Sequence, residues 1–216
     1  MPPFPKQFYA AHGTLELARR LLGCEFVHAS AIGTTAGIIV ETEGYLADDP
    51  GSHAFRRKTA RNAAMFGPAG TLYAYQIYNH YTCINVVSER EGIGEAVLIR
   101  ALEPTIGIDL MVRRRNEAFQ RGFARYRDKT VDASTPAGLR GLANGPAKLT
   151  IAMGMTIEEH NASSLSGGAV FIRPAKAQGR GEGVHAIVTT TRIGLSQGAE
   201  LAYRYYLAAN RFVSKR

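Results

Sequence analysis

The sequence predicts one α+β domain that spans residues 1–216. A chain of this length can bury one sizeable core and is marginal for two. No internal repeat and no linker-like stretch divides it. Short helical patterns and β-branched runs are both present, and together they favour the α+β class.

A short helix and two hairpins are predicted in the first half. Residues 14–23 place Thr14 as the N-cap and Gly23 as the terminator of a helix. Residues 24–30 and 35–45 are typical of two strands joined around residues 31–34. Residues 71–77 and 82–87 predict a second hairpin, with its turn at residues 78–81.

The second half alternates strands and helices less regularly. Residues 96–102 are typical of a buried strand interrupted by Arg100, and a helix is predicted from Glu103 to about Arg115. Residues 113–140 are polar and basic, which predicts a surface helix followed by a loop. Proline favours a first helical turn, so residues 147–153 are predicted to be helical. Residues 169–172 and 184–190 are predicted strands, and residues 198–210 are predicted to be partly helical.

One strand carries charge where a buried strand should not. Within residues 38–45, Glu41, Glu43 and Tyr45 share a face because successive strand side chains alternate. Carboxylates that continue a buried strand are costly unless they are paired or functional, and Arg100 is the predicted partner. The pattern alone leaves open either a strand end that enters solvent or the floor of a polar site.

Two further segments are unusual for a compact domain. Residues 46–70 lack regular periodicity and contain His53 and a basic run at 56–61, which by itself is typical of a solvated loop. Residues 71–88 concentrate tyrosines, and Tyr73 and Tyr75 share one strand face. Tyr78, at the predicted turn, is difficult to bury.

The composition excludes several classes of protein. No apolar run approaches the roughly 18 residues of a membrane span, and the N-terminus lacks a secretory signal pattern. The two cysteines, Cys24 and Cys83, have no metal-ligand spacing and fit small core residues in a reducing compartment. Lys and Arg outnumber Asp and Glu by 26 to 18, and the resulting charge of +8 hints at a polyanionic partner.

Five sequence blocks resemble one family when they are taken together. They are IIVETEGYLADDPGSHAF, KTARNAAMFGPAGTLYAYQIYNHYTCINVVS, AVLIRALEP, LANGPAKLTIAMG and TTTRIG. Their content and order resemble the alkyladenine (3-methyladenine) DNA glycosylases. The resemblance implies a mostly antiparallel, curved sheet with surrounding helices and a protruding β-hairpin. It also implies an enzyme that flips alkylated or deaminated purines out of duplex DNA and hydrolyses the N-glycosidic bond without a metal or a cofactor.

The resemblance further implies roles for single residues. By motif position, Glu43 matches the general base that activates a water, and Arg100 matches a residue that helps place that water and a phosphate. The backbone carbonyl of Ile193 matches the group that holds the water from the other side. Around the flipped base, the matches are Tyr45, His53 and Tyr75, which sandwich and edge it, and Asn85, which crowds the exocyclic amine of guanine.

The DNA contacts implied by the family lie on the hairpin and the basic segments. Tyr78 matches the side chain that enters by the minor groove and fills the hole in the duplex. Expected backbone contacts are Arg57, Lys58, Thr59, Arg61, Lys148 and Arg192. The sequence departs from the family pattern at residues 79–80, 56–58 and 60. The expected partner is double-stranded DNA with a damaged purine, bound by a monomer that is intracellular and DNA-associated (cytoplasm or nucleoid in a bacterium) and binds no membrane.

Three alternatives remain at the level of the sequence. Glu41 and Glu43 lie roughly 6.5–7 Å apart on a strand, which suits an inverting glycoside hydrolase, although the basic charge and the absence of tryptophan argue against it. The tyrosines and arginines also suit a non-catalytic nucleic-acid binder, which leaves Glu43 unexplained. A lyase would need a Schiff-base lysine, and Lys148 at a helix start better suits a phosphate contact or a structural role. Glu41 is expected to be structural.

Overall fold

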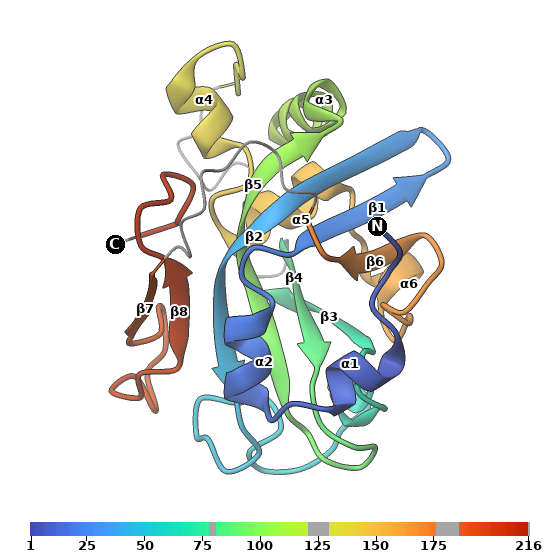
Figure 1. Cartoon of the computed structure of the whole chain (residues 1–216), viewed down its shortest axis with the longest axis vertical. Helices are drawn as coiled ribbons and strands as arrows, with labels where there is room; N and C mark the ends of the chain where they lie inside the picture. The colour runs from blue at the N-terminus through green and yellow to red at the C-terminus, as the bar shows by residue number, and fades with distance from the viewer. Residues whose placement is uncertain (78–80, 121–129, 176–185, 216) are drawn as a thin grey trace.

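Eight strands form one curled antiparallel sheet in the part of the chain that the structure describes (Figure 1). The computed structural model describes residues 1–77, 81–120, 130–175 and 186–215. The strand order is β3-β4-β5-β2-β1-β6, with β8 beside β2 and β7 beside β8. The strands are β1 (Glu25–Ser30), β2 (Gly33–Tyr45), β3 (Leu72–Ile77), β4 (Tyr81–Val87), β5 (Ala96–Ile106), β6 (Val170–Arg173), β7 (Ile187–Thr190) and β8 (Arg204–Leu207). The predicted α+β fold with an antiparallel curved sheet is confirmed.

Strand β2 lies at the centre of the sheet and pairs with different strands along its length. Its first half pairs with β1, its second half pairs with β8 at residues 41–43, and β5 accompanies nearly all of it. The register between β2 and β5 shifts on both sides of Glu41, which sets Arg100 opposite the interval between Glu41 and Thr42. Such bulges re-aim side chains, and they are frequent beside active sites.

Helices cover the sheet and complete the core. They are α1 (Lys6–Ala10), α2 (Thr14–Arg20), α3 (Ile108–Gln120), α4 (Pro136–Gly141), α5 (Pro146–Met153) and α6 (Ile157–His160), with a 3-10 turn η1 (Ala63–Phe66). Leu17 of α2 and Leu149 of α5 are fully buried in one apolar cluster with Ile39 and Ile99 of the central strands. Burying each such side chain contributes about 1.5–3 kcal/mol. Among the described helices, none combines the length and the apolar character needed to cross a membrane.

The helix predicted from Glu103 to about Arg115 is present as α3, but it begins later, at Ile108, because β5 continues to Ile106. Glu103 and Pro104 pair with Ile38 and Gly37 of β2, whose length extends the ladder beyond the apolar run. The strand ends at Gly107, which has a φ of +72° and where a Cβ atom would lie 2.3 Å from the carbonyl oxygen of Thr34. Only glycine fits this turn, and α3 begins directly after it.

Two other expectations are corrected by long-range contacts. Residues 198–210 hold strand β8 and no helix, because the second half of β2 offers an edge that only this segment covers among the described strands. Thr14 is the first residue of α2 and its N-cap is Gly13. The Thr14 hydroxyl instead bonds to Ser88 and Glu95.

A buried pair of histidines links β1 to α6. The carbonyl oxygen of Met153 accepts from Nδ1 of His28 at 2.7 Å, so the neutral ring accepts at Nε2 from Nε2 of His160, 3.2 Å away. His160 in turn accepts at Nδ1 from the amide of Thr156. The contact between the two rings requires a neutral His28, since a proton added to His28 would set two N–H groups face to face.

Protonation of His28 is therefore expected to destabilise the fold. Burial lowers the pKa of His28, and His160 and Arg114 lower it further against the opposing effects of Met153 and Glu159. Because the unfolded chain then binds the extra proton, stability is complete above about pH 6.5 and falls below it, by at most about 1.4 kcal/mol per pH unit. Denaturant unfolding of wild type and His28→Gln between pH 5 and 8 measures this slope. A wild-type slope equal to that of the variant would contradict the prediction.

Candidate active site

Glu43 is fully buried on β2, between β5 and β8. Its Oε2 atom accepts from the hydroxyl of Tyr45 at 2.9 Å and from Nη1 of Arg100 at 3.0 Å. Its Oε1 atom accepts from the backbone amide of Ile193 at 2.9 Å. A carboxylate with three donors is a satisfied anion, so Glu43 lies at the floor of a polar site and not at a strand end in solvent.

Arg100 supplies the positive charge that the sequence predicted for this strand. Its Nε atom donates to Glu41 at 3.2 Å, and its Nη1 atom donates to Glu43. Burial alone would lower the pKa of Arg100, but the adjacent Glu43 and Glu41 outweigh it and raise this pKa. The guanidinium therefore stays charged, and the predicted pairing of Arg100 with the glutamates of β2 is confirmed.

Tyr45 connects Glu43 to the surface. Burial and the negative charge of Glu43 raise the pKa of Tyr45, so its hydroxyl stays protonated and donates to the carboxylate. The guanidinium of Arg192 lies over the ring, 4.7 Å from its centroid. Cation–π contact covers this side of the ring.

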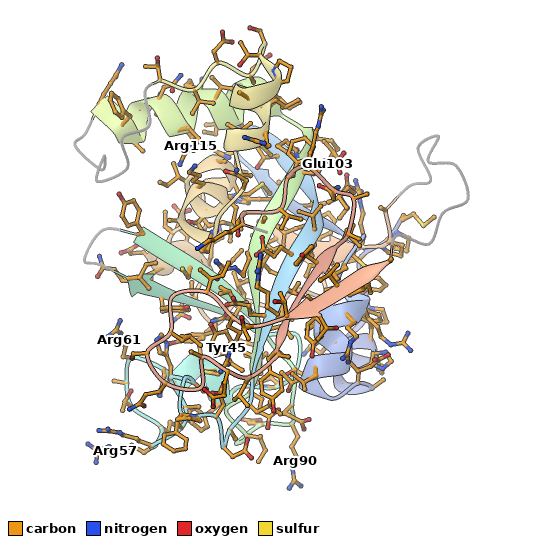
Figure 2. All side chains as sticks on the ribbon, turned by 90° about the vertical axis from the view of Figure 1, so that its left-hand side faces the viewer. Tyr45, Arg57, Arg61, Arg90, Glu103 and Arg115 are labelled. Carbon is orange, nitrogen blue, oxygen red and sulfur yellow. The ribbon has the colours of Figure 1, made fainter. Side chains whose placement is uncertain are left out.

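All four residues predicted to surround a flipped base line one cavity of about 70 Å³. Tyr45, His53, Tyr75 and Asn85 border it, together with Gly51, Met65, Tyr73 and Leu195. The four come from β2, the 46–70 segment, β3 and β4, so the curled sheet brings distant positions together. Figure 2 shows Tyr45 at the same end of the molecule as Arg57 and Arg61, away from Glu103 and Arg115.

Tyr73 is a wall of the site that the motif comparison missed. It is fully buried, stacks on Tyr75 with ring centroids 5.1 Å apart, and has its hydroxyl 3.1 Å from Nδ1 of His53. Burial raises the pKa of Tyr73 to about 12. Burial also lowers the pKa of His53, as does the positive charge of Arg61. The shared strand face of Tyr73 and Tyr75 was the signal in the sequence that could have identified it.

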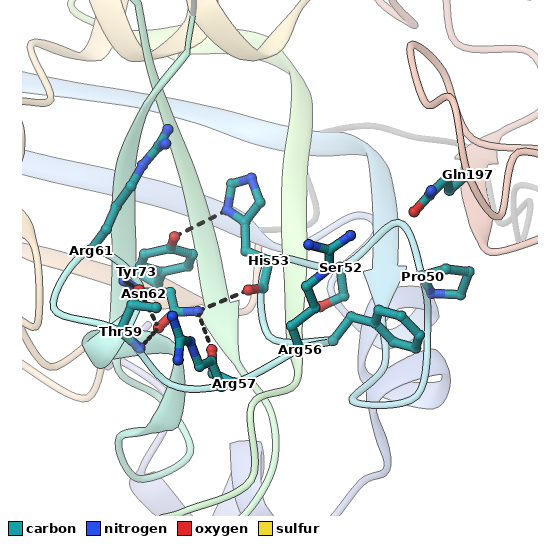
Figure 3. A pocket seen from close by; sticks show the side chains of 11 residues that line it. Pro50, Ser52, His53, Arg56, Arg57, Thr59, Arg61, Asn62, Tyr73 and Gln197 are labelled. Atoms are coloured by element: carbon teal, nitrogen blue, oxygen red, sulfur yellow. Dashed lines mark hydrogen bonds between the residues drawn. The ribbon is translucent and has the colours of Figure 1, made fainter.

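A second cavity of about 290 Å³ (Figure 3) shares His53 and Tyr73 with the first. Arg57, Thr59 and Arg61 line it, as expected for residues of one basic segment. Asn62 holds this segment in shape: its amide donates to the carbonyl oxygens of His53 and Arg57, and its Oδ1 accepts from the amide of Thr59. The loop is thus ordered by local bonds, which leaves the arginine side chains at the rim exposed.

Arg192 lies in the interior and not on the DNA-facing surface expected for it. Its guanidinium forms a buried ion pair with Asp49 and donates to the carbonyl oxygens of Gly44 and Gly198. These bonds fasten the loop that carries Ile193 against β2. Arg192 is therefore a structural residue of the site and not a phosphate contact.

The remaining predicted residues are placed as follows. Lys148 is half-buried on α5, with Nζ 3.4 Å from Oδ1 of Asn144. Lys58 is exposed, and its Nζ lies 5.8 Å from the ring centroid of Phe66. Ile193 contacts Glu43 through its amide, and the role of its carbonyl stays a prediction. Tyr78 lies outside the described residues.

The sequence is similar to one family over nearly its whole length. Residues 7–211 match the model of the methylpurine-DNA glycosylase family. A protein of Methanoculleus marisnigri is 44% identical over 98% of both chains, and one of Carboxydothermus hydrogenoformans is 41% identical over 98% of both. A protein of Agrobacterium fabrum is 40% identical over 100% of this chain and 94% of its own. The names of all three describe them as candidate 3-methyladenine DNA glycosylases.

The fold, the buried carboxylate and the family match define a hydrolase that acts on DNA. The chain belongs to the methylpurine-DNA glycosylase family, which makes it a DNA glycosylase of base excision repair. The resemblance seen in the five sequence blocks is thereby confirmed.

Proposed function

We propose that this glycosylase excises alkylated and deaminated purines, namely 3-methyladenine, 7-methylguanine, hypoxanthine and ethenoadenine. The lesion is flipped out of duplex DNA, its N-glycosidic bond is hydrolysed by a water, and an abasic site remains. The observation that carries the proposal is the fully buried Glu43 carboxylate directly behind Tyr45, a wall of the aromatic cavity. A flipped base is read in such pockets by stacking and by contacts to its edge.

Glu43 is proposed to be the general base. A carboxylate offers about four acceptor positions, and Tyr45, Arg100 and Ile193 donate to three of them. The fourth is proposed to accept from a water, whose proton moves to Glu43 while its oxygen bonds to the anomeric carbon, and the electrons of the broken carbon–nitrogen bond leave with the base. The same carboxylate stabilises the positive charge of an oxocarbenium-like transition state. The carbonyl of Ile193 is proposed to hold the water from the opposite side.

The aromatic cavity is proposed to select the base. Tyr45, His53 and Tyr75 offer ring faces and edges that attract a cationic alkylated purine. The Oδ1 atom of Asn85 is buried without a hydrogen-bond partner among the described residues. A buried polar atom that lines a cavity suits contact with a ligand edge, which supports a place for Asn85 at the edge of the flipped base. Its proposed rejection of guanine is steric, through crowding of the exocyclic amine.

The basic segment and the hairpin are proposed to hold the duplex. The second cavity is lined by Arg57, Thr59 and Arg61. Lys58 and Lys148 complete the proposed phosphate contacts. Tyr78, which lies between β3 and β4 in the sequence, is proposed to enter the minor groove and replace the flipped nucleotide. The protein is proposed to act as a DNA-associated monomer.

The structure weakens the alternatives. Both oxygens of Glu41 accept bonds from arginines or from Ser214, so Glu41 does not suit a free second carboxyl group of an inverting glycoside hydrolase. Family membership argues against a non-catalytic binder. Water is the proposed nucleophile, since Lys148 is bonded to Asn144 at the start of α5 and does not line the aromatic cavity.

A duplex assay tests the proposed substrates. Wild-type protein is expected to release hypoxanthine and ethenoadenine from 25-mer duplexes that carry one lesion each, and 3-methyladenine and 7-methylguanine from methylated DNA. The products are abasic sites, which hot alkali converts to strand breaks, whereas without alkali the strand should stay intact. The matched undamaged duplex is the control. Release from none of the four substrates would refute the proposal, and strand cleavage without alkali would refute water as the nucleophile.

A further inference from the structure

Glu43 is one end of a line of four buried charges. Along this line, Arg204 of β8 bonds to Glu41 of β2, Glu41 to Arg100 of β5, and Arg100 to Glu43 of β2. All four residues are at most 7% exposed. The signs alternate and the sum is zero, which is the arrangement that buried charges require.

Glu41 is the centre of this line and accepts four hydrogen bonds. Its Oε1 accepts from Nε of Arg204 at 2.7 Å, from Nε of Arg100 at 3.2 Å and from the hydroxyl of Ser214 at 3.0 Å. Its Oε2 accepts from the amide of Ser214 at 2.7 Å. The segment after β8 thus closes over Glu41, and Arg204 also donates to the carbonyl of Lys215.

We propose that Glu41 and Arg204 are positioning residues of the glycosylase reaction, acting through Arg100 on Glu43. The inference rests on the proposed role of Glu43. Arg100 is held at two points, by Glu41 at Nε and by Glu43 at Nη1, and a planar guanidinium held at two points has a fixed orientation. Strand β5 is out of regular register with β2 at Arg100, so the backbone pairing does not determine the orientation of the guanidinium. The contact with Glu41 determines it.

The same line sets the electrostatic environment of the general base. Each element around Glu43 contributes charged or titratable groups to its surroundings. They are Glu41 and Tyr45 of β2, Cys83 of β4, Arg100 of β5, Arg192 of the loop between β7 and β8, and Arg204 of β8. Glu41 and Arg204 oppose each other in this set. Removing the negative charge of Glu41 favours the ionised base, and removing the positive charge of Arg204 favours the protonated base.

Two variants with opposite expected effects test the proposal. In Glu41→Gln, the acid limb of the pH profile of single-turnover base release should move to lower pH by about one unit, and in Arg204→Gln it should move to higher pH by about one unit. The maximal rate should fall by roughly 10–100-fold in Glu41→Gln because Arg100 loses an anchor. Affinity for the lesion duplex should stay within about threefold, since neither residue is at the surface.

A partly buried ion pair away from Glu43 supplies the control. Glu25 is 7% exposed and pairs with Arg173 at 2.7 Å, on strands β1 and β6 away from Glu43. Glu25→Gln should lower the thermal midpoint without moving the acid limb. If Glu41→Gln and Arg204→Gln behave like Glu25→Gln, the proposal is wrong and the line is only structural. If Glu41→Gln does not fold, the shift of the acid limb in Arg204→Gln alone decides whether the proposal holds. An active Glu43→Gln would instead refute the proposed general base.

Discussion

Replacing Glu43 by glutamine is expected to abolish base release, with a fall of at least about 10³-fold in the single-turnover rate. Glutamine keeps the length of the side chain and an acceptor oxygen for the amide of Ile193. It removes the basicity that takes the proton from water and the charge that stabilises the transition state, and general-base contributions are typically 10²–10⁴-fold. Quench-flow or gel assays of a duplex with one hypoxanthine measure the rate.

Binding separates this effect from a folding defect. The Glu43→Gln variant should keep the affinity for the same duplex, because the carboxylate is fully buried and faces no phosphate in the proposed complex. Glu16→Gln is the matched control, since Glu16 is exposed in an i,i+4 pair with Arg20 and should lose nothing measurable. Retained release by folded Glu43→Gln would assign the base to another residue.

Replacing Asp49 by alanine is expected to lower the free energy of unfolding by about 3–5 kcal/mol. Asp49 and Arg192 have side chains exposed by 1% and 0%, and the change leaves the Arg192 guanidinium buried without its carboxylate. For a chain of this size the thermal midpoint should fall by roughly 6–20 °C. Calorimetry measures it. The loop of Ile193 should loosen as well, which would lower base release at temperatures where the variant is still folded.

A double variant shows whether the unpaired charge is the cause. Asp49→Ala combined with Arg192→Met removes both charges, and it should recover part of the stability lost in Asp49→Ala. A loss below about 1 kcal/mol in Asp49→Ala would mean that this pair is hydrated in solution and contributes as little as a surface pair.

Local sequence patterns predicted the elements whose pairing partners lie nearby in the sequence, or whose burial follows directly from an apolar run. The hairpin of β1 and β2 followed from strand patterns on both sides of a short turn, and the glutamates of β2 required a cation, which Arg100 provides. The helix that became α3 was predicted to start too early, at Glu103, because a proline after an acidic residue is typical of a helix start. The extended conformation of Glu103 is set by its pairing with β2, more than 60 positions earlier in the chain.

Charge alone also could not tell a surface arginine from a buried one. Arg61 and Arg192 both lie in family-like blocks and both were expected at the DNA backbone. Arg61 is exposed and donates to the carbonyl of Gln76, whereas Arg192 is enclosed by Asp49 and by two backbone carbonyls. Two of the partners of Arg192, Asp49 and Gly44, are distant in the sequence, and no local pattern indicates them.

The sequence by itself determined the family, the α+β class and the identity of the candidate base. The reason is that the five blocks match the family in content and order, and these blocks contain the side chains that the site needs. Only the tertiary structure decided how these side chains cooperate. It placed β8 beside β2, brought Glu41, Arg100 and Arg204 into one line, added Tyr73 to the pocket and withdrew Arg192 from the surface. The physical reason is that a buried charge is stable only beside its partners, and those partners come from strands that meet only in the folded sheet.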